Sequence, residues 1–280
     1  MKILVTGGAG FVGTNLIKEL KSNHDITSID NYSIGLEQNH LDGVKYLNLD
    51  VTNIDKIENN FDVIFHLAGL SRIQPSFKNF KETFRSNSTG TLNVLEFAKL
   101  NNSKLIYSGS SSKHHDPYQS PYATSKYIGE ELLLSYKRIY NLDLHIARFY
   151  NVYGPYEIIE GQWAAVIGLW RGKIKKNEPL PIVGDGNQKR DFTHVSDIVD
   201  GLIKIMNYEK NDNFIWELGY GENFSLNEIF NLFNKKFKCE KIYISQQLGN
   251  YKETKRENNK ALDLLGWQPK GSIVDYIMNF

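Results

Sequence analysis

Short apolar runs alternate with longer segments of helical periodicity through the first half of the chain. The apolar runs, rich in β-branched residues, span 3–6, 26–29, 44–49, 63–67, 105–108 and 144–149. Such alternation is typical of βαβ units, in which successive strands lie parallel in one sheet. The pattern therefore predicts an α/β fold with a doubly wound parallel sheet.

Two of the intervening segments carry an apolar stripe at helical spacing. In 11–21 the stripe contains Phe11, Leu16 and Leu20, and in 88–99 it contains Leu92 and Leu95. An apolar stripe on one side of a helix buries that side against a neighbouring layer. We expect each helix to cover one face of the sheet.

The alternation fades after Gly154-Pro155, where aromatic segments, shorter helices and Gly/Pro turns take over. We predict a dinucleotide-binding domain over 1–154, to which 185–210 also contributes, and a smaller C-terminal α/β lobe over 155–280 that binds mainly substrate. No long low-complexity linker separates the halves, so the two parts are expected to pack directly and leave a cleft between them.

Charge and cysteine content exclude several classes of protein. The 280 residues contain 33 basic and 32 acidic side chains, which gives no global field for nucleic acid or anionic membranes. Cys239 is the single cysteine, so neither an intrachain disulfide nor a cysteine-rich metal site is expected. No apolar run approaches the length that spans a bilayer, and we predict a cytoplasmic protein without a membrane partner.

A glycine-rich turn follows the first apolar run. Gly7, Gly10 and Gly13 stand between a predicted strand and a predicted helix. This spacing allows a tight turn, close approach of the backbone to a ligand, and a helix N-terminus aimed at a pyrophosphate. The turn predicts a Rossmann-type dinucleotide site; the competing interpretation is a tight turn without a ligand.

Asp30 ends the second predicted strand, where a carboxylate accepts hydrogen bonds from both ribose hydroxyls and repels a 2′-phosphate. No arginine follows it closely, which favours NAD over NADP. The alternative is an ordinary turn aspartate in the sequence Asp30-Asn31-Tyr32-Ser33.

A second motif suits redox chemistry at an alcohol carbon. Tyr122 and Lys126 are four residues apart in a segment that is helical to about residue 136, so both side chains leave the same face. A nearby ammonium favours the phenolate, which then acts as a general base toward a sugar hydroxyl. Ser110 follows the fifth strand, at the sheet edge where α/β folds bind ligands. A chance Tyr/Lys pair and a flexible serine loop are the alternatives.

Together these residues resemble the extended short-chain dehydrogenase/reductases that act on nucleotide sugars. The resemblance covers nearly the whole chain. Its further motifs are Asp50-Val51, His66-Leu67-Ala68-Gly69, Asn87-x-x-Gly90-Thr91, Arg148-x-x-Asn151-Val152-Tyr153-Gly154-Pro155, Gly184-x-Gly186-x-x-x-Arg190-Asp191-Phe192 and Leu265-Gly266-Trp267.

The resemblance implies roles for these positions. Asp50 and Val51 would meet the adenine, Asn87 the nicotinamide side, and Asn151 with Arg190 the diphosphate of a nucleotide-diphosphate sugar; an ion pair of Arg190 with Asp191 or Asp185 is the alternative. The predicted catalytic residues are Ser110, Tyr122 and Lys126. The predicted contacts to NAD are Gly7, Gly10, Phe11, Val12, Gly13, Asp30, Asn31, Ser33, Gly35, Asp50, Val51, Leu67, Ala68, Gly69, Asn87, Tyr122 and Lys126, and those to substrate are Ser110, Asn151, Arg190 and Thr254.

The residues after Ser110 favour one reaction of the family. Dehydratases resembling this chain carry an Asp-Glu pair there, whereas Ser111 and Ser112 cannot act as acid and base for elimination. A decarboxylase needs a site for a C6 carboxylate, and the sequence marks no extra basic residue near Ser76 or Ser110 that clearly supplies one. We therefore expect an NAD-dependent 4-epimerase that works through a transient 4-keto sugar.

One three-residue segment and three single positions differ from the family pattern or bear on which sugar is bound. Lys113-His114-His115 replaces the family's Val-Tyr-Gly, and Gln247 replaces a diphosphate-binding arginine, a role that Lys252 or Lys255 would share. A metal site at the adjacent histidines is disfavoured because their side chains point apart. Ser71 stands where some 4-epimerases carry a lysine. Thr254 is small where a tyrosine restricts relatives to plain hexoses, which makes an N-acetylhexosamine pair an alternative to UDP-glucose and UDP-galactose.

Other functions remain open from the residues alone. Within the family these are a 4,6-dehydratase, a decarboxylase and a 4-keto reductase; outside enzymes, a regulatory protein that binds NAD(H) without catalysis is the alternative. By resemblance, the helices over 84–99 and 123–136 pair two subunits, and a homodimer is expected.

Overall fold

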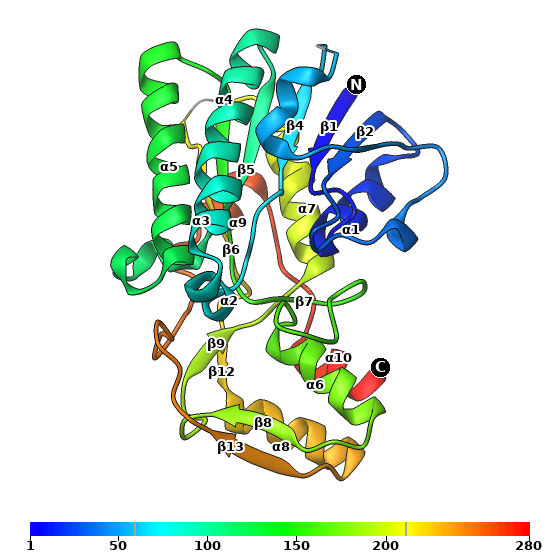
Figure 1. Cartoon of the computed structure of the whole chain (residues 1–280), viewed down its shortest axis with the longest axis vertical. Helices are drawn as coiled ribbons and strands as arrows, with labels where there is room; N and C mark the ends of the chain where they lie inside the picture. The colour runs from blue at the N-terminus through cyan, green and yellow to red at the C-terminus, as the bar shows by residue number, and fades with distance from the viewer. Residues whose placement is uncertain (59, 211) are drawn as a thin grey trace.

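A computed structural model describes residues 1–58, 60–210 and 212–280. Its main feature is a parallel sheet of seven strands within those residues, in the order β11-β6-β5-β4-β1-β2-β3 (Figure 1). The strands are β1 (Lys2–Thr6), β2 (Asp25–Asp30), β3 (Lys45–Asn48), β4 (Val63–His66), β5 (Lys104–Ser110), β6 (Leu144–Phe149) and β11 (Ile215–Leu218). The predicted doubly wound parallel sheet is confirmed.

Helices cover both faces of this sheet, because successive side chains of a buried strand point to opposite sides. Ile3 and Val5 of β1 belong to the apolar core beneath α1 (Phe11–Leu20), α7 (Val195–Met206) and α9 (Lys260–Leu265). Leu4 belongs to the core on the other face, beneath α4 (Gly90–Asn101) and α5 (Pro121–Tyr140), which lie side by side in Figure 1.

The order of strands reverses direction between β1 and β4. From β1 the chain runs outward to β2 and β3, and then returns to β4, β5 and β6 on the other side of β1. In open α/β sheets, ligands bind in the crevice at the carboxyl ends of strands beside such a switch point. The topology therefore places a binding crevice after β1 and β4.

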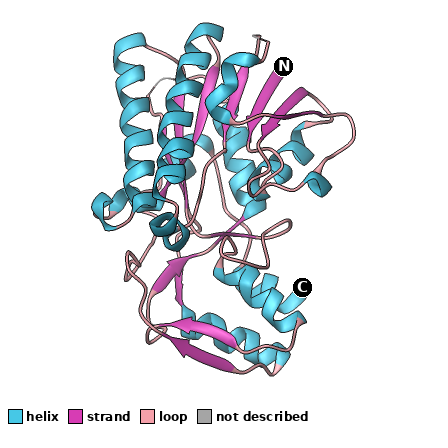
Figure 2. Ribbon diagram, in the orientation of Figure 1, coloured by secondary structure: helices cyan, strands magenta, loops and turns pink. Residues whose placement is uncertain are grey.

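The smaller lobe is built mainly from chain beyond residue 155, and lies at the carboxyl edge of the sheet (Figure 2). Its elements are α6 (Val166–Lys175), β8 (Leu180–Val183), β9 (Lys189–Asp191), β12 (Asn223–Ser225), α8 (Leu226–Phe237), β13 (Lys241–Ile244) and α10 (Ile273–Asn279). Trp170, Ile182 and Phe233 are buried in a core of its own. Two short parallel strands, β7 (Val152–Tyr153) and β10 (Thr193–His194), join the lobe to the sheet domain.

The chain crosses between the two parts more than once. α7 packs on the sheet, and β11 pairs with β6 to complete the sheet although it comes later still. The boundary at residue 154 is therefore a description of most, but not all, of the chain, and the division into a cofactor domain and a substrate lobe stays a prediction.

Short helical turns connect these elements near the carboxyl edge. The helices are α2 (Ile73–Lys78) and α3 (Phe80–Phe84); a π-helical turn over Arg85–Thr89 leads into α4, and 3₁₀ turns occupy Glu37–Asn39, Val51–Lys56, Ser111–His114 and Pro117–Gln119. Helices shorter than three turns take their stability from packing rather than from propensity. They form the walls of the site described next.

Candidate active site

A cleft of about 790 Å³ opens at the carboxyl edge of the sheet, between it and the smaller lobe. That volume is within the range of cofactor and ligand sites. Most predicted cofactor contacts line it: Gly7, Gly10, Phe11, Val12, Gly13, Asp30, Asn31, Ser33, Gly35, Val51, Leu67, Ala68, Gly69, Tyr122 and Lys126. The predicted substrate contacts Ser110, Asn151, Arg190 and Thr254 line it too.

The glycine-rich turn leaves room only for backbone. Gly7 has a φ of +72°, a conformation that favours glycine, and a Cβ there would stand 2.8 Å from the Ala68 backbone. A Cβ on Gly13 would stand 2.3 Å from the carbonyl oxygen of Gly7. α1 therefore starts directly at the turn. No side chain among the described residues caps its first turn, so the free N–H groups of that turn suit a pyrophosphate.

Asp30 lies at the far end of the same cleft, at the end of β2. Its Oδ2 accepts a hydrogen bond from the Ala9 N–H at 3.1 Å, and its Oδ1 accepts one from the Tyr32 N–H at 2.9 Å. Gly35 packs against it so closely that a Cβ would meet the carboxylate at 2.7 Å. Burial raises the pKa of Asp30, and the two backbone hydrogen bonds oppose this. Held in place with acceptor sites open to the cleft, the carboxylate fits a ribose diol.

Ser110, Tyr122 and Lys126 all line the cleft. β5 continues through Ser110, two residues beyond the predicted strand, and so carries this hydroxyl to the sheet edge. α5 starts at Pro121, capped by the Ser120 side chain, so Tyr122 stands in its first turn. The Tyr122 hydroxyl donates a hydrogen bond to Ser110 Oγ at 3.2 Å.

Lys126 is held one turn further along α5. Its Nζ donates to the Ser108 carbonyl oxygen at 2.6 Å and lies 4.5 Å from the centre of the Tyr107 ring. Burial lowers the pKa of Lys126 to about 8, against the opposing charge of Glu130. Burial raises the pKa of the Tyr122 hydroxyl from its ordinary value, while its bond to Ser110 and the charge of Arg72 act in the opposite direction. Positive charge added beside this hydroxyl would lower its pKa and favour the phenolate.

The other end of the cleft is formed by the smaller lobe. Asn151 Nδ2 donates to Thr254 Oγ1 at 3.1 Å and to the Asp191 carbonyl oxygen at 3.1 Å, which fixes both side chains on the cleft wall. Arg190 donates to the Lys189 carbonyl oxygen at 2.8 Å and has no ion pair within the described part of the chain. The alternative of a pair with Asp191 or Asp185 is thus not what the structure shows.

Two predicted cofactor contacts lie outside the cleft lining. The Asp50 carboxylate pairs with Arg85 at 2.7 Å and accepts from Thr52 and Asn31, and the hydrogen bond from Arg85 holds its pKa well below the usual range. Asn87 is buried, bonded to both backbone groups of Leu70. Each side chain braces the wall of the cleft, and a contact with NAD stays a prediction for both.

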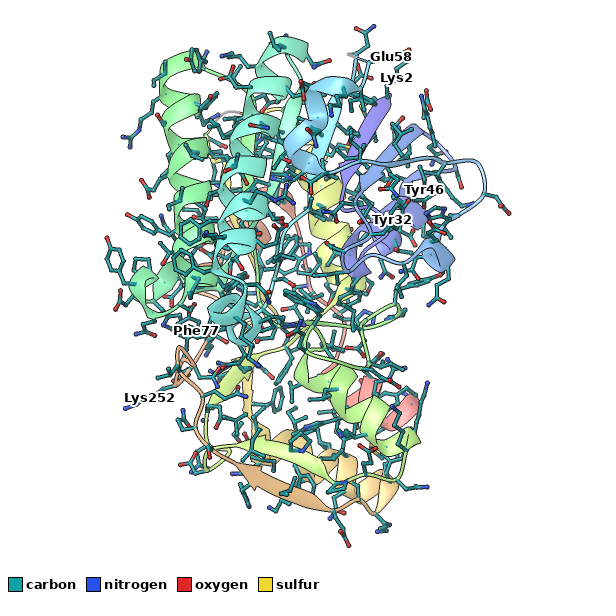
Figure 3. All side chains as sticks on the ribbon, viewed as in Figure 1. Lys2, Tyr32, Tyr46, Glu58, Phe77 and Lys252 are labelled. Atoms are coloured by element: carbon teal, nitrogen blue, oxygen red, sulfur yellow. The ribbon has the colours of Figure 1, made fainter. Side chains whose placement is uncertain are left out.

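The replaced family positions have partners of their own. His114 Nε2 lies 2.9 Å from Glu217 Oε1, whereas the His115 ring stacks on Tyr251 with 3.9 Å between centroids. The two histidines therefore do point apart, and no cluster of three metal-ligating side chains is found in the described residues. Gln247 lines the cleft, while Lys252 points outward at the edge of the molecule in Figure 3.

Sequence reasoning missed several residues of the cleft wall. Arg72, Lys78 and Tyr251 line it, and none of them belongs to a motif that marks it out. Asp30 is the sole carboxylate in the lining within the described residues. With Lys126 and Arg190, the cleft thus holds four cationic side chains and one carboxylate, a balance that favours an anionic ligand.

Comparisons with known proteins agree with this geometry. The family model of the NAD dependent epimerase/dehydratase family matches residues 3–219. A UDP-glucuronate 4-epimerase of Thermodesulfobacterium geofontis is 32% identical, over 97% of this chain and 92% of its own. UDP-glucuronic acid decarboxylase 2 of Arabidopsis thaliana is 30% identical, over 98% of this chain and 66% of its own.

A solved structure shares the whole fold. The UDP-glucose 4-epimerase of Thermotoga maritima, crystallised with UDP-glucose, superposes with a TM-score of 0.91 at 27% identity, covering 99% of this chain and 96% of that one. No helix among the described residues is long and apolar enough to cross a membrane. The chain belongs to the NAD-dependent epimerase/dehydratase family, within the extended short-chain dehydrogenase/reductases, and its cofactor is NAD.

Proposed function

We propose that the protein is a nucleotide-sugar 4-epimerase. The observation that carries the proposal is the composition of the cleft: Ser110, Tyr122 and Lys126 all line it, and no second carboxylate does so within the described residues. The hydroxyls of Ser110 and Tyr122 and the ammonium of Lys126 suit the oxidation and reduction of an alcohol. A dehydratase would need a second carboxylate to eliminate water.

Each of the three side chains has a distinct task. Tyr122 takes the proton of the C4 hydroxyl and later returns it, and Ser110, already 3.2 Å from the Tyr122 hydroxyl, holds that sugar oxygen in place. Lys126 favours the phenolate by its charge and is fixed by the Ser108 carbonyl oxygen. NAD, when bound, supplies the acceptor for the C4 hydride and gives it back, so the cofactor is not consumed.

Residues of the turn and of the smaller lobe would hold the two ligands. Gly7 to Gly13 with the start of α1 receive the pyrophosphate of NAD, and Asp30 its ribose. Arg190 and Asn151 are placed to bind the diphosphate of the sugar nucleotide. With the diphosphate held, the 4-keto sugar can rotate and present its other face to the cofactor.

The nature of the sugar is the open part of the function. UDP-glucose with UDP-galactose, or the N-acetylated pair admitted by the small Thr254, are the substrates that the sequence motifs favour. Decarboxylation is a second candidate, because a curated relative is a UDP-glucuronic acid decarboxylase and because the cleft does contain Arg72, a basic residue four positions before Ser76.

One experiment separates these reactions. Purified protein is incubated with a panel of nucleotide sugars without added cofactor, and products are followed by mass and NMR. An isomer of unchanged mass supports the epimerase. Loss of water would instead indicate a dehydratase, and loss of carbon dioxide a decarboxylase. A requirement for stoichiometric reductant would indicate a reductase. If no sugar is turned over, the result favours the non-catalytic NAD(H)-binding protein.

A further inference from the structure

Arg72 is a cation on the cleft wall, and no carboxylate of the described residues forms an ion pair with it. It immediately precedes α2, and its Nε donates to the Trp163 carbonyl oxygen at 2.9 Å, which fixes the plane of the guanidinium. Neither terminal nitrogen makes a hydrogen bond or an ion pair with the described part of the chain. A planar fork held by one nitrogen leaves the other two free to bind a planar anion side by side.

The nearby acid is already in use. Glu157 is the carboxylate whose charge reaches Arg72, but its Oε1 accepts from Arg171 at 2.7 Å and from Tyr276 at 3.3 Å. Asp30, the carboxylate of the cleft lining, stands at the ribose end. The charge of Arg72 is therefore available to a ligand.

Arg72 stands at the catalytic end of the cleft. The Tyr122 N–H donates to Ser76 Oγ at 3.2 Å, which ties α2, and with it Arg72, to the start of α5. The charge of Arg72 lowers the pKa of the Tyr122 hydroxyl, so the guanidinium lies within electrostatic reach of the proposed reaction at C4. A group that reaches Arg72 therefore belongs to the sugar or to the phosphate next to it.

Two buried hydroxyls lie on the cleft wall close to each other and to Tyr122. Ser112 and Tyr251 both line the cleft, with exposed fractions of 4% and 8%, and neither Ser112 Oγ nor Tyr251 Oη makes a well-formed hydrogen bond in the described residues. Burial and the nearby Tyr122 raise the pKa of the Tyr251 hydroxyl, and the adjacent Ser112 hydroxyl lowers it. A buried hydroxyl without a partner costs free energy, so both are ready to donate to a bound oxygen.

We propose that Arg72, together with the hydroxyls of Ser112 and Tyr251, binds the C6 carboxylate of a nucleotide-linked uronic acid. The inference rests on the proposed 4-epimerase function and narrows its substrate class. A neutral hydroxymethyl group would leave the guanidinium without its charge partner, whereas a carboxylate provides two coplanar oxygens for the fork and lone pairs for both hydroxyls.

The same contact explains how a 4-keto uronate would keep its carboxylate. Carbon dioxide leaves when the C5–C6 bond breaks, its electron pair forms the enolate with the C4 carbonyl, and a proton from solvent later adds at C5. The charge thus moves away from C6 during the step. A guanidinium paired with the carboxylate stabilises the starting state more than the transition state, which favours the epimer as product.

The diphosphate is the other anion that could reach Arg72, since Gln247 stands where relatives carry an arginine. Three probes distinguish the two sources: UDP-glucuronate carries both anions, UDP-glucose only the diphosphate, and UDP the diphosphate without a sugar. For each we measure kcat/KM or, for UDP, affinity, with wild type, Arg72→Ala, Arg72→Lys and Tyr251→Phe. Lys81→Ala, in the exposed part of α3, is the charge-matched control.

Wild type is expected to prefer UDP-glucuronate, and Arg72→Ala to lower kcat/KM for it about 30-fold, which corresponds to about 2 kcal/mol. Arg72→Ala is expected to change kcat/KM for UDP-glucose and the affinity for UDP by less than about threefold. Arg72→Lys and Tyr251→Phe should lower kcat/KM for UDP-glucuronate by smaller factors than Arg72→Ala. Lys81→Ala should leave it unchanged. Tyr251→Phe tests the site even where Arg72→Ala fails to fold.

Three other outcomes would separate a failure of the carboxylate site from a failure of the proposed epimerase function. Equal losses for all three probes would assign Arg72 to the diphosphate and overturn the carboxylate site. A preference for UDP-glucose, unchanged in the variants, would overturn it while leaving the epimerase intact. Release of carbon dioxide from UDP-glucuronate with the same Arg72 dependence would support the carboxylate site, but it would overturn the epimerase and the role of Arg72 in retaining the carboxylate.

Discussion

Arg148 lies in a cluster of charged side chains behind the 3₁₀ turn Ser111–His114. Among these side chains, we expect the loss of Arg148 to lower the free energy of unfolding most. Its Nε and Nη2 contact Glu130 on α5 at 2.8 to 3.2 Å, and its Nη1 contacts Glu217 on β11 at 2.8 Å. Both carboxylates are buried, with exposed fractions of 1% and 0%. Glu217 in turn contacts His114, the last residue of the 3₁₀ turn Ser111–His114. The cluster therefore couples the sheet to the turn that follows Ser110.

The change Arg148→Met removes the cation and leaves two buried carboxylates. Breaking a buried pair from one side costs about 3–5 kcal/mol. For a chain of this size that corresponds to a fall in Tm of about 6–10 °C. Glu217 keeps Tyr150 and His114 as partners, so most of the cost arises at Glu130, and adding Glu130→Gln to the variant should recover part of the loss.

The pKa of Glu217 determines whether the difference in Tm between wild type and Arg148→Met grows or shrinks as the pH falls. Burial raises the pKa of Glu217, but its bond to His114 and the charge of Arg148 outweigh burial and hold it below 4.5. A lowered carboxyl pKa contributes stability above the unfolded value, which is lost as pH falls. Without Arg148 that contribution shrinks, so the difference in Tm between wild type and Arg148→Met should be largest near pH 7 and smaller toward pH 4.5.

Thermal unfolding at pH 7 and pH 5 measures both effects. Arg138→Met, at the exposed end of α5, is the matched control and should change the free energy of unfolding by no more than about 0.5 kcal/mol. The reasoning is refuted if Arg148→Met and Arg138→Met shift Tm equally, or if the deficit of Arg148→Met grows as the pH is lowered.

Four further outcomes are expected. Tyr122→Phe should lower turnover about 10²–10⁴-fold with Tm and bound NAD unchanged; an active variant would remove the general base from the account. Gly13→Ala, whose Cβ would meet the Gly7 carbonyl oxygen at 2.3 Å, should purify without NAD, as absorbance and mass analysis would report. Because burial lowers the pKa of Lys126 to about 8, its charged form opposes folding below that pH; the stability of wild type relative to Lys126→Met should rise between about pH 8 and 10.5, and a flat difference would contradict this. If two subunits pair through α4 and α5, Leu92→Glu on the exposed side of α4 should lower the molar mass in light scattering to that of one 32.2-kDa chain, and a monomeric wild type would refute the predicted homodimer.

The sheet and the placement of Tyr122 and Lys126 were predictable because local pattern decides them. Period and turn chemistry place a helix from Phe11 onward, and the four-residue spacing puts Tyr122 and Lys126 on one face, whatever the rest of the chain does. β11 was not foreseen as the seventh strand. Its four residues follow α7, far beyond the region of regular alternation, and only pairing with β6 shows where they belong.

The cleft wall was harder to predict because it depends on long-range packing. Asp50 and Asn87 match family motifs, yet Arg85 and Leu70 engage them away from the lining. Arg72 faces the cleft because Trp163, 91 residues later, passes beside it and accepts its Nε hydrogen. Nothing within a few residues of Arg72 carries that information, so sequence reasoning did not find it.

The fate of the C4 hydrogen tests the central claim most directly. Protein is incubated without added cofactor with UDP-glucuronate and UDP-glucose that carry deuterium at C4, and the epimeric product is examined by NMR and mass spectrometry. The account predicts a product inverted at C4 that keeps its deuterium there, because the hydride removed from a bound sugar returns to the same carbon. An epimer whose C4 deuterium has been replaced by a proton from water would contradict it.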